Sequence, residues 1–185
     1  MLYELHDQPS LEDPVLVMVL EGWIDAGYAA TTAAQTLLGG IDSYPVATFD
    51  TDSLLDHRAR RPVMHLVDGV NTGVDYPEIL LQLGADADGR RFLLLTGAEP
   101  DRMWRGMSRT IVALARQAGV RQVLTLGAYP APVPHSRPAK VVASATTQDL
   151  ANRVGFLPGQ LDVPAGFNAA LERAAADDGI PACGL

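Results

Sequence analysis

Residues 14–38 read Pro14-Val-Leu-Val-Met-Val-Leu-Glu-Gly-Trp-Ile-Asp-Ala-Gly-Tyr-Ala-Ala-Thr-Thr-Ala-Ala-Gln-Thr-Leu-Leu38. The run from Pro14 to Leu20 is continuous, apolar and rich in valine. Such a run is typical of a strand covered on both faces, so we expect it to be central in a sheet. In residues 26–38, alanines and leucines recur at helical spacing, which predicts a helix packed closely on that sheet.

The same alternation of strands and helices extends through the rest of the chain. Apolar runs predict further strands at residues 44–49, 63–67, 91–96, 122–128, 141–145 and 180–185. Helical spacing predicts helices at residues 103–118, 148–154 and 167–176. Residues 50–61 are expected to form a polar loop, and the short run 79–83 fits either a strand or a helix. The helix at 103–118 should pack through Trp104, Met107, Ile111 and Leu114.

Strands that alternate with helices imply a mostly parallel sheet in a layered α/β domain with right-handed crossovers. At 185 residues the chain has the usual length of one domain, so we expect a single α/β domain over residues 1–185. Residues 180–185 look like the opening of a buried strand at which the chain stops. We therefore expect the polypeptide to lack a C-terminal part.

Composition and charge narrow the class of protein. The net charge of −8 argues against a nonspecific grip on nucleic acid, because duplex binding requires a basic surface. The longest apolar runs are far shorter than the roughly 20 residues of a membrane-spanning helix, and residues 1–7 lack the basic start of a secretory signal. We expect a cytoplasmic protein with neither a nucleic-acid nor a membrane partner. The single cysteine, Cys183, fits a small buried hydrophobe.

Four polar segments, at residues 21–25, 50–61, 97–105 and 129–138, each follow the carboxyl end of a predicted strand. In open α/β sheets that edge is where ligands bind, so we expect the four segments to converge on one cleft. The sequence shows no metal-ligand spacing, no GxSxG elbow and no serine–histidine–aspartate order. It therefore predicts no metal and no cofactor.

The first segment resembles a phosphate loop in the spacing of its two glycines. Tyr28 and Ala29 stand where such a loop needs a lysine and a serine or threonine, so the segment is not a nucleotide P-loop. Its acidic residues, Glu21 and Asp25, are candidate ligand-binding groups. Asp25 also fits the N-cap of the following helix, and we favour that interpretation.

The second and fourth segments each place arginine beside histidine. In the second, Arg58 and Arg61 adjoin His57, and this cluster either grips an anion bidentately or forms a solvated loop or subunit contact. In the fourth, prolines restrict the backbone around His135 and Arg137, which suits either the rigid display of a site or a structural loop. We expect Arg137 to present a guanidinium to an anion near the helix that begins at residue 103.

The third segment opens that helix. Asp101 is a candidate helix cap, and Arg102 and Arg105 lie in the first turn, where the helix dipole disfavours cations. An anionic group should therefore compensate. Glu99, Asp101 or a bound anion fits that role, and we favour the pairs within the chain.

Four motifs together have a specific resemblance. They read Glu21-Gly-Trp-Ile-Asp-Ala-Gly27, Asp75-Tyr-Pro-Glu-Ile-Leu-Leu81, Leu94-Leu-Thr-Gly-Ala-Glu-Pro-Asp101 with Trp104, and Pro130-Ala-Pro-Val-Pro-His-Ser-Arg-Pro138. The combination resembles actinobacterial members of the proteasome assembly chaperone 2 family over most of the chain. The resemblance implies a phosphorylase/hydrolase-like α/β fold, similar to that of purine nucleoside phosphorylases, and homo-oligomers that are often trimers. Family members continue past Leu185, which again implies a missing C-terminal part.

Two hypotheses follow for function. The first is a proteasome-assembly-chaperone-2-like protein that acts noncatalytically as an oligomer and binds a protein partner. The second is a small-molecule enzyme of the nucleoside phosphorylase or hydrolase type, which rests on fold analogy alone. In the second, an anion would be held by Arg58, Arg61, Arg105 and Arg137, and protons would be moved by His57, Glu99 or His135. The sequence names neither a substrate nor a partner.

Overall fold

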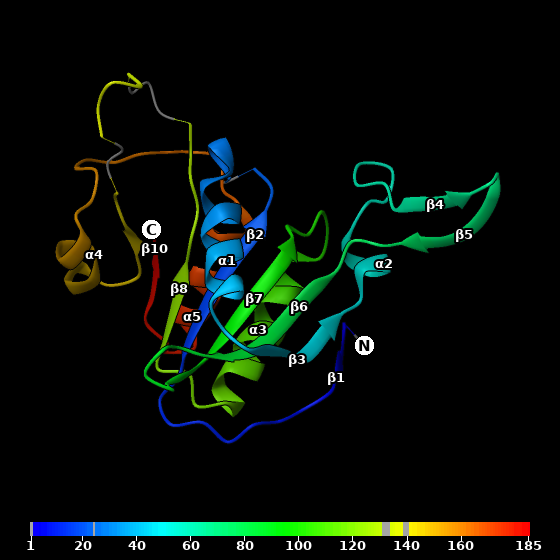
Figure 1. Ribbon diagram of the computed structural model, residues 1–185. Coiled ribbons are helices and arrows are strands. Elements are labelled where there is room, and N and C mark those ends of the chain that lie inside the picture. Colours follow the sequence, from blue (N-terminus) through cyan, green and yellow to red (C-terminus); the bar gives the residue numbers. More distant parts are fainter. Residues whose placement is uncertain (1, 24, 131–133, 139–140) are drawn as a thin grey trace.

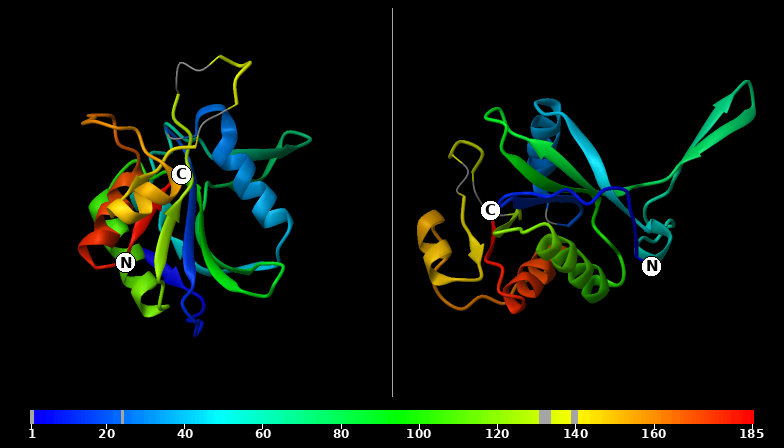
Figure 2. Two further views of the ribbon diagram at one scale, coloured as in Figure 1. Left: turned by 90° about the vertical axis from the view of Figure 1, so that its left-hand side faces the viewer. Right: turned by 90° about the horizontal axis from the view of Figure 1, so that it is seen from below.

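The structure of the chain is a computed structural model that describes residues 2–23, 25–130, 134–138 and 141–185. Its centre is an eight-stranded mixed sheet in the order β1-β3-β6-β7-β2-β8-β10-β9 (Figure 1). A second sheet contains only β4 and β5, which form a hairpin. Helices cover both faces of the large sheet (Figure 2).

The middle of the large sheet is parallel. Its four neighbouring strands are β7 (Arg91–Ala98), β2 (Val15–Glu21), β8 (Gln122–Thr125) and β10 (Ala182–Gly184). β2 lies between β7 and β8, and Met18 in its middle is fully buried, which confirms the predicted central strand. The outer strands are antiparallel to their neighbours and are β6 (Ile79–Ala85), β3 (Ser43–Phe49), β1 (Tyr3–Leu5) and β9 (Ser144–Ala145).

The expectation of a mostly parallel sheet is wrong. Three of the strand pairings in the large sheet are parallel and four are antiparallel. β6 and β7 are separated only by residues 86–90, where Asp86 N donates to Arg90 O over 3.0 Å. A parallel pair needs a crossover of a dozen or more residues, so this short turn produces an antiparallel hairpin. The run 79–83, which the sequence left open, is thus a strand.

Three of the helices form layers on the two faces of the sheet, and two shorter ones lie at its margins. The helices are α1 (Ala29–Gly39) with the short 3-10 turn η1 (Ala26–Tyr28) before it, α2 (Thr51–Leu54), α3 (Trp104–Gln117), α4 (Gln148–Val154) and α5 (Phe167–Asp177). α1 covers one face of the sheet, and α3 and α5 lie side by side on the other (Figure 2). Within the described residues, no helix has the length and apolar content that a bilayer crossing requires.

The larger core lies between the sheet and the α3–α5 layer. Met107 and Ile111 are fully buried there, Leu114 is nearly so, and Trp104 packs edge-on against Phe167 with the ring centroids 5.9 Å apart. This confirms the predicted packing face of the helix at 103–118.

The opposite layer is thinner, because α1 contacts the sheet through small residues. Ala30 and Ala34 pack against Val19 and Leu94, as the helical spacing of alanines predicted. Cys183 in β10 is also buried, in agreement with its interpretation as a small hydrophobe.

The segment at 50–61 is more ordered than the polar loop that the sequence predicted. Asp50 accepts hydrogen bonds from the backbone N and hydroxyl of Ser53, which lower the pKa of Asp50 and cap α2. Leu54 and Leu55 then enter the core with almost no exposed surface. These two leucines anchor the segment, and its polar part begins only after them.

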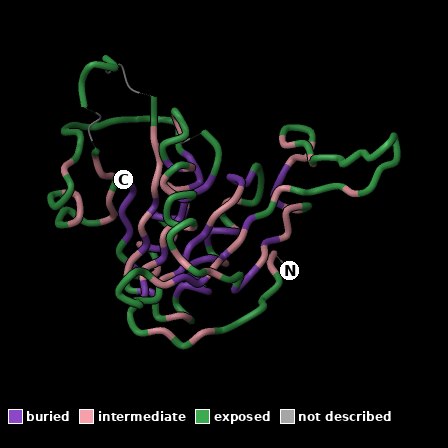
Figure 3. The backbone as a smooth tube through the Cα atoms, viewed as in Figure 1, coloured by how far each residue is buried: buried purple, intermediate pink, exposed green. Residues whose placement is uncertain are grey.

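The hairpin of β4 (Val63–Val67) and β5 (Val70–Asp75) follows that segment and extends away from the body of the molecule (Figure 1). Residues 63–67 are therefore a strand, as predicted, but one outside the main sheet. All residues of β4 are exposed, and the backbone trace shows the whole hairpin standing free (Figure 3). We call residues 63–75 the arm.

Candidate functional site

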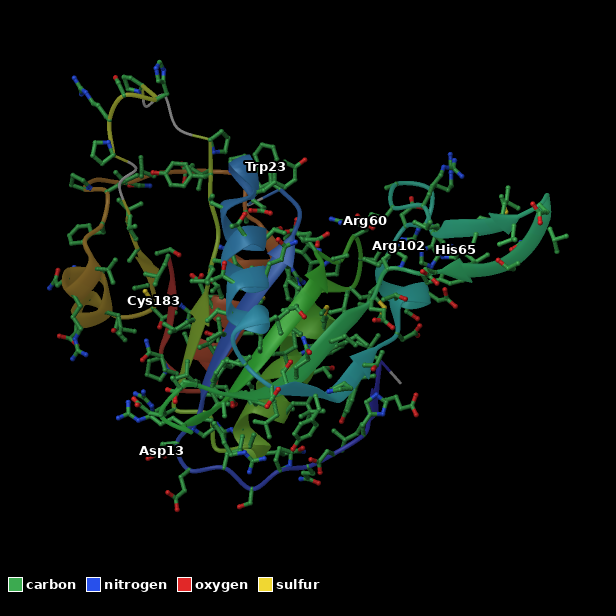
Figure 4. The ribbon with its side chains drawn as sticks, viewed as in Figure 1. Asp13, Trp23, Arg60, His65, Arg102 and Cys183 are labelled. Atoms are coloured by element: carbon green, nitrogen blue, oxygen red, sulfur yellow. The ribbon has the colours of Figure 1, made fainter. Side chains whose placement is uncertain are left out.

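Three of the four predicted polar segments meet at the carboxyl edge of the parallel strands. The carbonyl oxygen of Glu21, at the end of β2, accepts from Glu99 N over 2.9 Å and from the Arg60 guanidinium over 2.8 Å. Asp101 Oδ2 accepts from Asp56 N over 2.7 Å. Arg102 lies 3.8 Å from the Asp56 carboxylate, and Figure 4 shows Arg60 and Arg102 between the body and the arm.

Glu99 is nearly buried, and both of its carboxylate oxygens accept backbone hydrogen bonds. Oε1 accepts from Phe167 N over 2.7 Å, and Oε2 accepts from Trp23 N over 3.1 Å. Phe167 is the first residue of α5, whose N-cap, Gly166, has no side chain to offer. The Glu99 carboxylate therefore supplies the cap of α5 and complements the positive end of its dipole. It does not compensate the arginines at the start of α3.

Asp25 has a role close to the predicted one: the N-cap of α1 is Tyr28, but the Asp25 carboxylate binds amides of the first turn of α1. Its Oδ1 accepts from Ala30 N over 2.8 Å and from Thr31 N over 3.3 Å, and its Oδ2 accepts from the Thr31 hydroxyl. These amides belong to the first turn of α1, where no earlier carbonyl partner is available. The side chain of Glu21 is exposed, and its backbone carbonyl forms the contacts of this edge.

The predicted cap by Asp101 is wrong. The N-cap of α3 is Met103, in the left-handed region with φ 57°, and it makes no side-chain capping bond. The Asp101 carboxylate is already used by Asp56 N, because Asp101 N and Arg102 N both donate to Leu54 O and so draw the two segments together. Asp56 provides the anionic compensation for Arg102.

His57 lies at the base of the arm and is held by two side chains. Its Nε2 is 3.0 Å from Asp52 Oδ1, and its ring meets Tyr76 edge-on with the centroids 5.4 Å apart. Arg58 and Arg61 are exposed in the same loop. The guanidinium that reaches the site belongs to Arg60, which was not among the predicted residues. All three residues are arginines, so the conformation of the loop, and not the residue type, decides which of them points inward.

The residue just before the fourth segment, Ala128, contacts the start of the first helix. Ala26 N donates to Ala128 O over 2.8 Å. The tip at 134–138 is exposed and stands beyond the N-terminal end of α1, whereas the loop at residues 56–61 lies by the arm on the other side of the molecule (Figure 1). Among the described residues, no hydrogen bond links His135 or Arg137 to the other three segments, and residues 131–133 of this segment lie outside the described part.

The arginines predicted to hold one anion are therefore found in three places. Arg58 and Arg61 are at the base of the arm, Arg137 is in the loop after β8, and Arg105 lines a groove on the outer face of α3 and α5. The described residues contain no cluster of histidine, cysteine and acidic side chains suited to a metal ion.

A buried carboxyl group lies elsewhere, between α5 and the end of the sheet. Glu172 accepts from the Thr125 hydroxyl over 2.6 Å and from the Ser144 hydroxyl over 2.9 Å. Burial raises the pKa of Glu172, and burial together with Glu172 raises the pKa of the Cys183 thiol. No local sequence pattern reveals this cluster, because its members come from three elements far apart in the chain.

The arm is a second feature that was not predicted from the sequence. Asp68 and Gly69, both with positive φ, form the turn between the strands, and an Asp-Gly pair between apolar stretches is a recognised hairpin signal. Six apolar side chains of the arm are exposed: Val63, Met64, Leu66, Val67, Val70 and Val74. Their exposed fractions lie between 41% and 62%, values that are typical of surface rather than core positions.

The PAC2 family model matches residues 19–185 of this chain. The chain belongs to the PAC2 family. Among curated proteins, none matches it.

Solved structures of relatives agree with this membership. A Mycobacterium tuberculosis protein of unknown function is 39% identical, with a TM-score of 0.88, and the match covers 99% of this chain and 66% of that one. A Corynebacterium glutamicum protein of unknown function is 32% identical, with a TM-score of 0.89 and coverages of 99% and 70%. A proteasome-assembly chaperone homologue from M. tuberculosis is 30% identical, with a TM-score of 0.85 and coverages of 92% and 72%. The chain thus spans just under two thirds of the first relative.

In this PAC2 chain, two glycines of the motifs have structural reasons to be glycine. A side chain at Gly22 would overlap Glu99, whose Cβ would lie 2.7 Å from the added carbon. Gly97 has φ +119°, and an added carbon would collide with the carbonyl of Glu78, the residue just before β6. The two glycines therefore allow close contacts on both sides of the β7 end: Gly22 lies against Glu99, and Gly97 lies against the residues at the start of β6.

Proposed function

We propose that this PAC2 protein is a noncatalytic binding or assembly protein that acts as a homo-oligomer, a trimer by its family resemblance, and contacts proteins through the arm. The single observation that carries the proposal is the exposure of six apolar side chains on a hairpin outside the sheet. Cytoplasmic location and an actinobacterial source belong to the same proposal, and the latter agrees with the Mycobacterium and Corynebacterium relatives.

The apolar side chains occupy both faces of the arm. Met64 pairs with Val74 on one face, and Val67 pairs with Val70 on the other, since opposite residues of an antiparallel pair share a face. A two-stranded hairpin is marginally stable in water by itself and presents unpaired edges. A partner that covers both faces would remove apolar surface from water and stabilise the strands, which supports a protein-binding role.

The base of the arm is braced, so the arm is displayed in a defined direction. The contact of His57 with Tyr76 lies where β5 returns to the body, and the bond from Asp56 N to Asp101 fixes the loop that leads to β4. Bracing of this kind reduces the conformational entropy lost on binding.

The contacts of the candidate catalytic side chains also support a noncatalytic role. The Glu99 carboxylate accepts hydrogen bonds from two backbone amides. His57 is hydrogen-bonded to Asp52 and packs edge-on against the Tyr76 ring. His135 stands in a separate loop, and among the described residues no hydrogen bond joins Glu99, His57 and His135 to one another, which gives the nucleoside phosphorylase or hydrolase alternative no support. The M. tuberculosis relative described as a proteasome-assembly chaperone homologue adds support from the family.

The test is the oligomeric state of arm variants, measured by size-exclusion chromatography with light scattering. Leu66→Ser with Val70→Ser changes one side chain on each face of the arm, and Leu161→Ser with Val163→Ser changes two exposed apolar residues elsewhere as a matched control. Burial of each such side chain contributes about 1.5–3 kcal/mol, so the arm variant should dissociate at about a hundredfold higher concentration or more.

The control variant should keep the wild-type mass. A wild-type chain that is monomeric at micromolar concentration, or an arm variant that assembles like wild type, would contradict the proposal. A thermal-shift panel of phosphate, nucleosides and sugar phosphates examines the enzyme alternative, which a saturable shift with a nucleoside would favour.

A further inference from the structure

The outer face of the α3–α5 layer carries a long groove that is separate from the arm and from the carboxyl edge. It has a volume of about 690 Å³ and is bounded by residues of α3 from Arg105 to Arg116 and by residues of α5 from Ala170 to Asp177. That length of α3 corresponds to about 16 Å at 1.5 Å per residue. The groove is thus elongated and open to solvent along the two helices.

The floor of the groove is made of small apolar side chains. Ala113 and Val112 of α3 face Ala170 and Ala174 of α5 across it. Small side chains let the backbone of a further helix approach two neighbouring helices at the 8–10 Å spacing of packed helices. The shape and floor of the groove therefore fit a helix better than a compact small molecule.

The walls of the groove are basic, although the protein as a whole has a net charge of −8. Four arginines and two aspartates line it, which leaves a local net charge of +2. At one end the charges are already paired: Arg116 with Asp178 over 2.6 Å, and Arg173 with Asp177 over 2.6 Å.

The other end of the groove contains Arg105 and Arg109, one helical turn apart and both exposed. Within the described part of the chain, neither forms an ion pair. Two carboxylates at the same spacing on a facing helix would meet these guanidinium groups, which bind carboxylates bidentately. The charge is therefore complementary to an acidic helix and repels a basic one.

We propose that the groove between α3 and α5 binds an acidic amphipathic helix of a partner protein. Its small apolar residues rest on the alanines of the floor, and its carboxylates pair with Arg105 and Arg109. This surface is distinct from the arm, so the proposal stands whether or not the arm mediates oligomer formation.

The test measures binding of a fluorescent amphipathic peptide as long as α3, 14 residues, with glutamate at every fourth position beside an alanine-rich face. A second peptide with lysine in place of each glutamate serves as its charge-reversed match. Fluorescence anisotropy with the full chain should show saturable binding of the glutamate peptide only, weakened by added salt because the charges are exposed.

Two double variants locate the binding. Arg105→Gln with Arg109→Gln should weaken binding of the glutamate peptide about tenfold or more, since two charged contacts are lost. Arg105→Glu with Arg109→Glu should weaken it further. The substitution at residue 105 places an acidic group in the first turn of α3, which favours the helix, and residue 109 is exposed, so the variant should stay folded. Arg90→Glu with Arg153→Glu, which changes two exposed arginines outside the groove, should bind as wild type.

Equal binding of the two peptides, absence of binding to the wild-type chain, or unchanged binding by both groove variants would overturn the proposal. Thermal stabilisation by inorganic phosphate that is lost in the glutamine variant, with no peptide binding, would also overturn it and point to a small anion. Neither result depends on the oligomeric state, so failure here is distinguishable from failure of the arm proposal.

Discussion

Replacement of Glu99 by alanine tests how much the Glu99 carboxylate contributes to the stability of the fold. The substitution leaves Phe167 N and Trp23 N without their acceptor and removes the charge that caps α5. The residue Phe167 is fully buried, so water does not reach its amide, whereas the bond at Trp23 is only part-buried. An orphaned buried amide costs about 1–3 kcal/mol and a solvated one less, so we expect a loss of about 2–4 kcal/mol in the free energy of unfolding.

Glu99→Gln gives an intermediate test of the same contact. Its amide oxygen serves one of the two backbone N–H groups, while its NH₂ faces the other donor, so we expect a loss of about 1–3 kcal/mol. Glu21→Gln is the matched control, because the Glu21 side chain is exposed and only its backbone carbonyl is used; it should change stability by less than about 0.5 kcal/mol.

Urea denaturation followed by circular dichroism measures all three variants. Equal stability of Glu99→Ala and Glu21→Gln would contradict this role, because the carboxylate would then not hold the β2, β7 and α5 segments together. A catalytic carboxylate predicts the opposite pattern, in which Glu99→Gln keeps stability and loses a ligand-dependent thermal shift.

Two further predictions concern stability. Burial raises the pKa of Glu172 above its ordinary value of 4.5, so the folded chain binds this proton more tightly than the unfolded chain. The wild-type protein should therefore lose stability as the pH rises from 4.5 through the raised pKa. Urea denaturation across this pH range should show no such loss for Glu172→Gln. Parallel pH profiles for the two proteins would contradict this. Gly97→Ala should lower the melting temperature strongly, because a φ of +119° is strained for alanine and the added carbon would collide with the Glu78 carbonyl. Gly89→Ala is the control, because Gly89 also has a positive φ but has open space around it. The difference between the two variants measures the effect of the collision.

Local patterns in the sequence predicted much of the fold. The central position of β2 follows from its uninterrupted apolar run, and the buried face of α3 follows from its helical spacing. Asp25 was predicted as a helix cap because a short carboxylate before a helix satisfies amides a few residues away. These features depend on contacts within a few residues or on average burial, which residue type and period report directly.

Two features were not predicted from the sequence. The run that forms β6 was left open, and Asp101 was wrongly predicted as the cap of α3. The run 79–83 is too short for its period to separate strand from helix, and only the turn at 86–90 makes the strand antiparallel. The Asp101 carboxylate was available as a cap by its position, but the amide of Asp56, 45 residues away in the chain, takes it instead.

The sequence by itself determined an α/β protein with a central apolar strand, a capped first helix and a PAC2-like set of motifs. Only the tertiary structure decided what those motifs do. The two backbone amides that donate hydrogen bonds to Glu99 lie 76 and 68 residues away in the chain, and no local pattern specifies a partner at that distance. It alone decided that β4 and β5 stand free, since Val63–Val67 is as apolar as a core strand. Hydrogen-bond partners and exposure depend on which distant segments occupy the space around a residue, and that arrangement is a property of the folded chain.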